Sequence, residues 1–153
     1  MKILIIGTVG TGKTTLAKHF SKVYNVNYYE IDSIVHDDNQ GGKKRSFKEQ
    51  DKIIEEINKN ESWIIEGVLR NNLEYLLEIA DKIIYLKIPK SKRNRRILIR
   101  FLKQKLKIEK ANYKPDIKML KSMLKWSNEF EKNKGTFEIL INTYKEKLEI
   151  RYN

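Results

Sequence analysis

The chain has 153 residues, a formal net charge of +12 and no cysteine. This length suits one domain with a substantial core, and the lack of cysteine excludes disulfides and thiolate metal sites. No apolar stretch is long enough for a transmembrane helix or a signal peptide, so we expect a cytoplasmic protein without a membrane partner.

The positive charge is concentrated in one segment. From Lys87 to Lys125 the chain has fifteen Lys or Arg and two acids, whereas the bases and acids elsewhere nearly cancel. Such a segment can be a solvated face, a nucleic-acid surface or a phosphate clamp. Charge alone does not choose among these three.

The first predicted element is a strand that leads into a glycine-rich loop. Residues 2–6 form an apolar run rich in β-branched side chains, which is typical of a strand buried on both faces. Residues 7–14 then fit the pattern G-x-x-x-x-G-K-[ST]. After the loop, four apolar residues recur at helical spacing: Leu16, Phe20, Val23 and Tyr24.

This strand, loop and helix together predict a phosphate site for ATP. Glycines let successive backbone N–H groups converge on an anion, and the helix presents its positive N-terminal end. We expect Lys13 to reach the β- and γ-phosphate oxygens and Thr14 to bind a partly hydrated Mg²⁺. The expected nucleotide-binding residues are Gly7, Thr8, Val9, Gly10, Thr11, Gly12, Lys13, Thr14 and Thr15.

Tyr28 to Asp32 read as a second strand that ends in an acid. Ligands of open α/β sheets lie beyond the carboxyl ends of the strands, so Asp32 would face the site, near Mg²⁺ or at an acceptor hydroxyl. A helix N-cap is the alternative role for this residue. We interpret His19 and His36 as structural or solvated.

Residues 37–46 form the clearest predicted loop, because a glycine pair and clustered charges resist regular structure. Ser46 and Glu49 have the spacing of a capping box. The helix that they begin is expected to end near residues 58–60.

Residues 63–70 contain the next candidate site. Trp63 to Ile65 read as a buried strand, and Glu66 is its terminal acid. An acid in this place can hold Mg²⁺ through water, as a Walker-B acid does. Gly67 permits a sharp turn, and the planar fork of Arg70 would grip an acceptor phosphate. The alternative is a strand-end acid beside a surface arginine.

The basic segment begins after the fourth predicted strand. We expect a helix over Leu73–Ala80, a strand over Lys82–Ile88 and a basic helix over about 91–106. Arg96 and Arg100 lie four residues apart and therefore on one face. Their stacked guanidiniums would neutralise the charge that develops on a transferring phosphoryl group.

The remaining elements are a connector, a helix and a strand. Residues 107–114 read as a polar connector, and Asp116 as the cap of a helix with apolar residues over 119–126. Phe137 to Ile141 read as a fifth strand. The dipeptide 142–143 would follow that strand, where the base of a nucleotide often lies.

The chain resembles the adenylate-kinase-like P-loop kinases and, within them, the bacterial topology modulation proteins. The resemblance rests on the phosphate loop, Asp32, the stretch from Trp63 to Gly67, Pro89 with Arg96 and Arg100, and Trp126. It implies an α/β P-loop NTPase fold like that of nucleoside monophosphate kinases. Its five-stranded parallel sheet would have the order 2-3-1-4-5 and be flanked by helices.

Adenylate kinases read Asp-Gly-Phe-Pro-Arg where this chain has Glu66-Gly67-Val68-Leu69-Arg70. The similarity implies that Glu66 helps to hold Mg²⁺ and that Arg70 contacts an acceptor phosphate. The loss of Phe-Pro leaves the identity of the acceptor open. The long adenylate kinase lid is absent, and the basic helix with its short connector stands in its place.

We therefore predict a single P-loop kinase-like domain over residues 1–153. An acceptor-binding region would span about 32–60, and a short basic lid about 90–116. The domain would transfer the γ-phosphoryl group of ATP to a small acceptor, preferably a nucleoside monophosphate, by positioning and charge stabilisation.

The expected roles follow from these motifs. Lys13, Arg96 and Arg100 would stabilise the transition state, and Asp32 and Arg70 would orient the acceptor. The alternative hypothesis is an ATP-binding, nucleic-acid-associated protein with little kinase activity. Segment 87–125 would then make non-specific phosphate contacts, although its aromatic residues are too sparse for a stacking platform.

Overall fold

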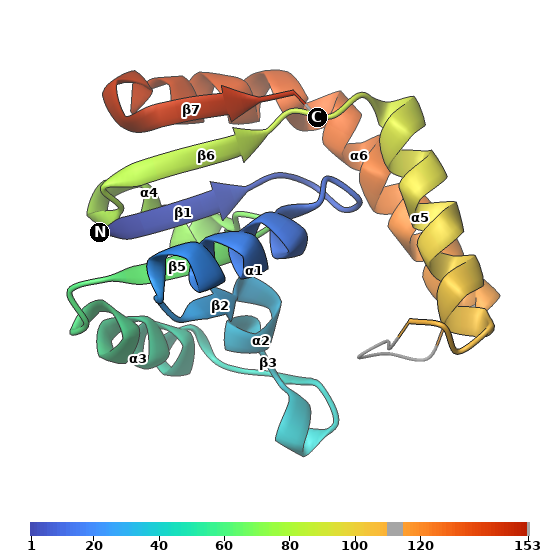
Figure 1. Cartoon of the computed structure of the whole chain (residues 1–153), viewed down its shortest axis with the longest axis horizontal. Helices are drawn as coiled ribbons and strands as arrows, with labels where there is room; N and C mark the ends of the chain where they lie inside the picture. Colours follow the sequence, from blue (N-terminus) through green and yellow to red (C-terminus); the bar gives the residue numbers. More distant parts are fainter. Residues whose placement is uncertain (110–114, 153) are drawn as a thin grey trace.

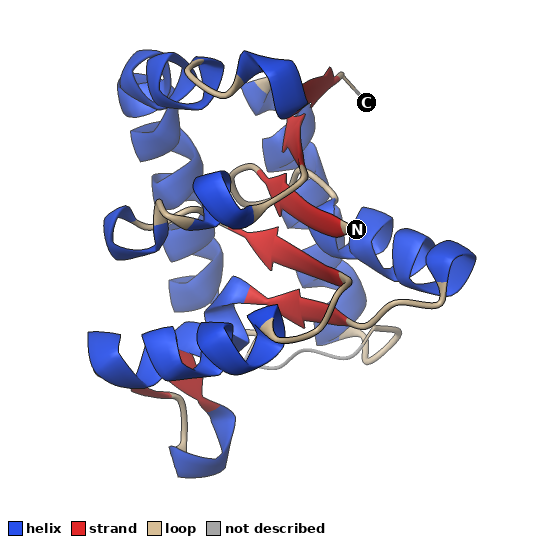
Figure 2. Cartoon of the chain, turned by 90° about the vertical axis from the view of Figure 1, so that its left-hand side faces the viewer, coloured by secondary structure: helices blue, strands red, loops and turns tan. Residues whose placement is uncertain are grey.

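The computed structural model describes residues 1–109 and 115–152 and has a parallel sheet between layers of helices (Figures 1 and 2). The sheet has five strands in the order β2-β5-β1-β6-β7, and every neighbouring pair is parallel. Counted along the chain within the sheet, this order is 2-3-1-4-5, which confirms the predicted P-loop NTPase fold. The strands are β1 (Lys2–Ile6), β2 (Tyr28–Glu30), β5 (Trp63–Gly67), β6 (Lys82–Leu86) and β7 (Leu148–Arg151).

The helices vary widely in length. They are α1 (Lys13–Tyr24), α2 (Ile31–Val35), α3 (Phe47–Asn58), α4 (Leu76–Ile79), α5 (Lys90–Lys105) and α6 (Ile117–Asn142). The described residues also contain three short 3₁₀ turns: η1 (Asp38–Gln40), η2 (Asn71–Leu73) and η3 (Lys145–Lys147). Strands β3 (His36–Asp37) and β4 (Lys43–Lys44) form a separate antiparallel pair.

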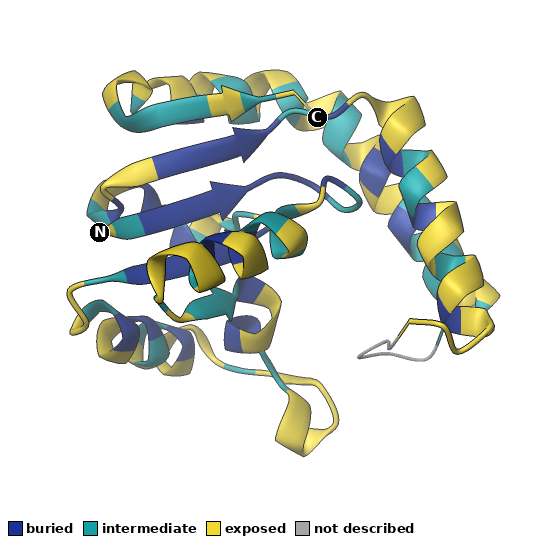
Figure 3. Ribbon diagram, viewed as in Figure 1, coloured by how far each residue is buried: buried dark blue, intermediate teal, exposed yellow. Residues whose placement is uncertain are grey.

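The central strands are buried on both faces, as Figure 3 shows for β1 and β6. Because successive residues of a strand point to opposite faces, β1 contributes to two cores. Leu4 and Ile6 pack with residues of α3, α4 and α6, whereas Ile3 and Ile5 pack with residues of α1. The apolar run at residues 2–6 therefore has the role that the sequence predicts.

The prediction of a strand at Phe137–Ile141 is wrong, because these residues belong to α6. Phe137 packs edge-on against Tyr85 with ring centroids 5.3 Å apart, and Phe130 lies 5.6 Å from Phe137 on the same helix. Phe130, Phe137 and Ile141 recur at a helical spacing of seven and four, so a helix presents all three to the core. The fifth strand is β7. Residues 142–143 are the last residue of α6 and its C-cap, so they precede the fifth strand and do not follow it.

Asp32 lies in a helix and not in a strand. Strand β2 ends at Glu30, and Asp32 is in the first turn of α2. Ile31, Ile34 and Val35 are all buried, and their spacing of three and four residues suits one helical face. Burial of this face ends the strand earlier than the sequence predicts.

Residues 37–46, expected to be an irregular loop, contain regular structure. The β3–β4 pair and η1 occupy most of this segment. Gly41 and Gly42 have φ angles of 68° and 79°, a region that glycine enters without the steric cost that other residues meet. The glycine pair thus makes the turn of a small hairpin.

Several predicted helix boundaries are confirmed. Ser46 and Glu49 form the capping box at the start of α3, which ends at Asn58. The Asp116 carboxylate accepts a hydrogen bond of 2.8 Å from the Met119 amide and caps α6. The helix expected over Leu73–Ala80 is divided between η2 and α4. Residues 110–114 of the predicted connector lie outside the described residues.

Helices α5 and α6 lie side by side at one end of the sheet (Figure 1). The N-terminal half of α6 packs on α5, and its C-terminal half reaches the sheet through Phe137, Leu140 and Ile141. Within residues 1–109 and 115–152, no helix combines the length and the hydropathy that crossing a bilayer requires.

Gly67 provides a test of the packing at the end of β5. A Cβ atom at Gly67 would come within 2.6 Å of Ile31 Cβ. We expect Gly67→Ala to lower the free energy of unfolding in urea by about 2 kcal/mol, because the buried Ile31 must shift to make room. In the matched control, Gly135→Ala in α6 adds a methyl group to open space and should stabilise by up to about 1 kcal/mol. Equal unfolding free energies of the two variants would contradict this packing.

Candidate functional site

The glycine-rich loop joins β1 to α1 at the carboxyl edge of the sheet. Gly10 and Gly12 have φ angles of 76° and 94°, so the loop needs residues without a Cβ at these two positions. Gly12 is also the N-cap of α1 and has no side chain to cap it. The free N–H groups of the first turn are therefore available to an anion.

Lys13 is half-buried and folds back over this loop. Its ammonium donates a hydrogen bond of 2.9 Å to the Thr8 carbonyl, and the Thr11 hydroxyl donates one of the same length to that oxygen. Burial lowers the pKa of Lys13, while the nearby Glu66 carboxylate acts in the opposite direction. A phosphate bound in the loop would therefore stabilise the charged form of Lys13, which burial disfavours.

The hydroxyl of Thr14 donates a hydrogen bond to Oε1 of Glu66. Glu66 is 3% exposed and lies in β5, level with Ile5 of the adjacent β1. Burial raises the pKa of Glu66, and the charge of Lys13 opposes this rise. The two residues predicted to hold Mg²⁺ are therefore in direct contact.

These two oxygen-bearing side chains fit a Mg²⁺ site in which most ligands come from elsewhere. Mg²⁺ prefers oxygen ligands and usually keeps several waters beside one or two protein carboxylates and the phosphates of a substrate. Among the described residues, no group of three or more His, Asp or Glu could hold a metal ion. A site shared with nucleotide phosphates is the arrangement that this donor set suits.

Glu30 belongs to the same group, although the sequence analysis did not select it. It ends β2 directly beside Glu66 in the parallel register. Its charge contributes to the raised pKa of Glu66 and opposes the lowered pKa of Lys13. The sequence does contain a signal for Glu30, because Glu30 and Asp32 are two acids separated by one residue near the end of a predicted strand.

Asp32 and Arg70 form an ion pair. Arg70 donates from Nη2 to Oδ1 of Asp32 over 2.8 Å. The Asp32 side chain is 68% exposed and the Arg70 side chain 36%, so both remain open to a solute. Asp32 is also close enough to oppose the lowered pKa of Lys13. The two residues predicted to bind an acceptor thus lie together, on the side of the site where α2 follows β2.

Arg96 and Arg100 project from α5 but have different partners. Arg96 donates from Nη1 to the Thr11 carbonyl over 3.1 Å, which joins α5 to the glycine-rich loop. Arg100 lies 3.5 Å from Glu109 through Nε. Its charge nevertheless contributes to the lowered pKa of Lys13. Arg96 therefore contacts the glycine-rich loop directly, whereas the effect of Arg100 on Lys13 is electrostatic.

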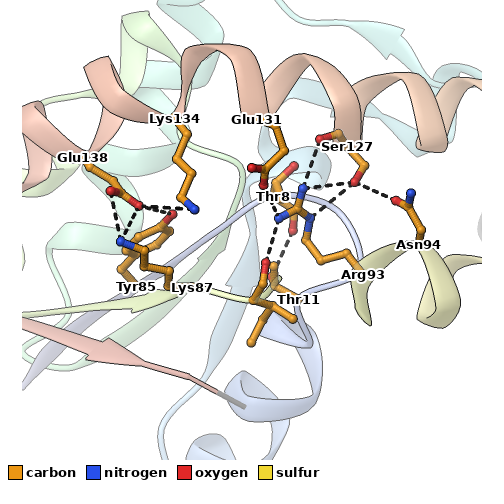
Figure 4. Close-up of polar contacts among 11 residues, drawn as sticks. Thr8, Thr11, Tyr85, Lys87, Arg93, Asn94, Ser127, Glu131, Lys134 and Glu138 are labelled. Carbon is orange, nitrogen blue, oxygen red and sulfur yellow. Dashed lines mark hydrogen bonds and ion pairs between the residues drawn. The ribbon is translucent and has the colours of Figure 1, made fainter. Parts of the chain in front are cut away.

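Arg93 attaches α5 to α6 (Figure 4). The residue is 1% exposed, and its guanidinium donates to the Ile88 carbonyl over 2.7 Å, the Ser127 carbonyl over 3.0 Å and the Glu131 carboxylate over 2.8 Å. The Arg93 carbonyl would lie 3.0 Å from a Cβ on Gly10. The buried arginine therefore also holds α5 against the loop. Within a run of basic residues, nothing in the sequence distinguishes it.

Part of the basic segment is neutralised within the fold. Lys87 pairs with Glu138 over 2.9 Å, as Figure 4 shows, and Lys125 lies 3.7 Å from Glu129. With Arg93 buried and Arg100 beside Glu109, the charge available to a nucleic acid is smaller than the sequence suggests. Among residues 1–109 and 115–152, no observation favours the nucleic-acid hypothesis.

Comparison with known proteins identifies the family and the fold of the chain. A family model described as an AAA domain matches residues 3–113, and because this is most of the chain, the protein belongs to that family. Two shikimate kinases from strains of Staphylococcus epidermidis are 42% identical over 33 residues, which is 22% of this chain and 19% of each relative. The match thus spans about a fifth of the length of these curated relatives.

Solved shikimate kinases share the fold over nearly the whole chain. The enzyme from Bacteroides thetaiotaomicron has a TM-score of 0.52 at 19% identity and covers 98% of this chain and 82% of its own. The enzyme from Acinetobacter baumannii, solved in complex with shikimate, has a TM-score of 0.55 at 14% identity, with coverages of 98% and 80%. The fold is therefore that of a P-loop NTPase of the kinase-like type.

The contact between Arg93 and Glu131 predicts a pH-dependent stability. The hydrogen bond from Arg93 lowers the pKa of Glu131 below its ordinary value of 4.5. The ionised carboxylate therefore stabilises the fold above about pH 4.5, and this stabilisation is lost as the pH falls through the lower, folded-state value. We expect Glu131→Gln to cost about 1 kcal/mol of unfolding free energy at pH 7, and the difference from wild type to shrink below about pH 4.5.

Urea unfolding at a series of pH values checks this expectation. Glu129→Gln is the matched control, because Glu129 pairs with Lys125 on the exposed side of the same helix and should change stability by less than about 0.5 kcal/mol. A destabilisation of Glu131→Gln that is the same at pH 3 and pH 7 would contradict the assigned cause.

Proposed function

We propose that the protein is an ATP-dependent small-molecule kinase that transfers the γ-phosphoryl group to an oxygen of its acceptor, either a hydroxyl or a phosphate oxygen. The observation that carries this proposal is the meeting of two groups of residues at one sheet edge. Lys13 and the Thr14–Glu66 contact form the nucleotide side. The Asp32–Arg70 pair forms the acceptor side. Membership of the AAA domain family and the shared shikimate kinase fold support it.

On the nucleotide side, the loop from Gly7 to Thr15 would bind the phosphates of ATP through its backbone N–H groups. Lys13 would exchange the Thr8 carbonyl for β- and γ-phosphate oxygens. Thr14 and Glu66 would hold Mg²⁺, which when bound neutralises charge on the phosphates. The raised pKa of Glu66 and the lowered pKa of Lys13 both arise from burial, and a bound Mg²⁺–phosphate pair would compensate both.

On the acceptor side, Asp32 would accept the proton of the acceptor hydroxyl and Arg70 would bind an anionic group of the acceptor. The hydroxyl oxygen bonds to the γ-phosphorus as the bond to the β-phosphate oxygen breaks, and ADP leaves. Arg96 and Arg100 would stabilise the charge on the transferring group. In this scheme of a single domain, residues 32–60 would form the acceptor region, and the short basic lid predicted over about 90–116 would be represented among the described residues by α5.

Two acceptor classes agree with an aspartate beside an arginine. One is a nucleoside monophosphate, as the adenylate-kinase-like motifs imply, whose ionised phosphate oxygen would take the place of the hydroxyl without giving up a proton. The other is a small hydroxy acid such as shikimate, the ligand in the A. baumannii relative. The resemblance to topology modulation proteins stays a prediction about family membership and adds no acceptor of its own.

The deciding experiment is ADP release from ATP and Mg²⁺ over a panel of acceptors. The panel includes shikimate, related hydroxy acids, the common nucleoside monophosphates, a lane without acceptor and a lane with DNA. We expect one small molecule to raise the rate at least about tenfold over the lane without acceptor. Acceleration by DNA alone, or the failure of every compound in the panel to accelerate ADP release, would contradict a small-molecule kinase.

Substitutions separate nucleotide binding from acceptor binding. We expect Lys13→Ala to raise the Kd of ATP by about tenfold or more, since a charge-assisted phosphate contact is lost. Arg70→Ala should raise the KM of the accelerating acceptor by a similar factor and change the Kd of ATP less than about twofold. Fluorescence titration with an ATP analogue and initial-rate kinetics measure the two constants. An equal loss of ATP affinity in both variants would refute the assignment of Arg70.

A further inference from the structure

We propose that Gln50 is a positioning residue for the acceptor side of the site, where its buried amide holds the segments that carry Asp32 and Arg70. The inference rests on the proposed function, in which these two residues bind the acceptor. Gln50 lies in α3 and touches neither of them directly in the contacts described above. Its effect would be transmitted through Arg45 and Asn72.

Both ends of the Gln50 amide are hydrogen-bonded in a fully buried environment. Gln50 has 0% exposure. Its Nε2 donates to the Arg45 carbonyl over 2.8 Å, and its Oε1 accepts from Nδ2 of Asn72 over 3.0 Å. A carbonyl oxygen can only accept, so the contact with Arg45 fixes which end of the Gln50 amide carries the donors. The amide therefore bridges two specific partners in one orientation.

The Arg45 end of this bridge closes the helix that carries Asp32. The Arg45 guanidinium donates from Nη1 to three carbonyls at the end of α2, those of Ser33, Ile34 and His36, over 2.7, 3.1 and 2.7 Å. The last carbonyls of a helix have no partner within the helix, so Arg45 supplies what α2 lacks. The Arg45 amide also donates to the Val35 carbonyl over 2.8 Å. A shift of the Arg45 backbone would move α2.

The Asn72 end of the bridge holds the turn that follows Arg70. Asn72 lies in η2, which begins directly after Arg70, and the Leu73 amide donates to the Arg70 carbonyl over 2.8 Å. The ion pair of Arg70 with Asp32 then returns to α2. The contacts form a closed ring: Asp32, Arg70, Asn72, Gln50, Arg45 and back to α2.

The exposed part of this ring depends on its buried part. An ion pair between side chains that are 36% and 68% exposed contributes little by itself. It cannot be expected to set the separation of Asp32 and Arg70. Removal of the Gln50 amide would leave the Arg45 carbonyl and the Asn72 amide, both of half-buried residues, without these partners, and both segments would shift to regain hydrogen bonds.

The test substitutes Gln50 by a residue of similar shape without the amide. We expect Gln50→Met to raise the KM of the acceptor by about tenfold, with the KM of ATP changed less than about twofold. The acceptor used is the panel compound that accelerates ADP release, with shikimate as the first probe. Asn72→Ala breaks the same ring, so its effect on the acceptor KM should not add to that of Gln50→Met.

Tyr75→Phe is the matched control. The Tyr75 hydroxyl donates to Asp51 over 3.0 Å and so links α3 to the chain just after η2, but it contacts neither Arg45 nor Asn72 in the structure described. We expect it to lower the Tm by a few degrees, as Gln50→Met does, with the acceptor KM unchanged. An equal rise of the acceptor KM in Tyr75→Phe and Gln50→Met would show a loss of stability only and overturn the proposal.

Hydrogen exchange keeps the inference testable without an acceptor. Gln50→Met should speed the exchange of amides in α2 and η2 by about tenfold relative to Tyr75→Phe, with amides of α1 unaffected. Unchanged exchange in α2 and η2 would overturn the role of Gln50. If no acceptor raises ADP release by the wild-type protein above the lane without acceptor, the proposed kinase function fails. If an acceptor does so, and Gln50→Met has the same acceptor KM as the wild type, this inference alone is refuted.

Discussion

The parallel pairing of β1 with β5 is the constraint on which the site depends. It sets Ile5 level with Glu66, so the acid at the end of β5 lies beside the loop that leaves β1. Glu66 is buried, and a buried carboxylate is costly unless it is paired. The Thr14 hydroxyl and the Lys13 charge stabilise the ionised Glu66 carboxylate, and the proposed Mg²⁺ would do so too. Every other candidate residue is arranged around this buried contact between loop and strand.

A second buried charge determines where the basic helix lies. The Arg93 guanidinium is buried and is satisfied by the Ile88 carbonyl, which follows β6, and by the Ser127 carbonyl and the Glu131 carboxylate of α6. Such a group tolerates few alternative arrangements, because each lost partner leaves an uncompensated charge. The N-terminal half of α5 is therefore fixed against the glycine-rich loop, which brings Arg96 to the Thr11 carbonyl. Any lid motion would have to come from the part of α5 that follows Arg93.

Predictions from the sequence succeeded where a local pattern is compatible with only one backbone conformation. The glycine-rich loop, the capping box at Ser46 and the cap at Asp116 are confirmed because their chemistry is complete within a few residues. They failed at Phe137–Ile141, where an apolar, aromatic run suits either a strand or one face of a helix. The contact of Phe137 with Tyr85, which is distant in sequence, and with Phe130 on the same helix decided for the helix. The short α2 was missed for the same reason, since burial of Ile31 under Gly67 depends on the neighbouring strand.

The sequence by itself determined the phosphate loop and the residue types at the strand ends, whereas the order of the sheet was implied by the resemblance to P-loop kinases. The loop and the strand ends depend on backbone conformation and on side-chain alternation, which are local properties. Only the tertiary structure decided that Glu30 stands beside Glu66, that Arg93 is buried while its neighbours are exposed, and that Gln50 joins Arg45 to Asn72. Each of these contacts joins separate elements through strand register or burial. Such long-range geometry is set by how the whole core packs and leaves no periodic signal along the chain.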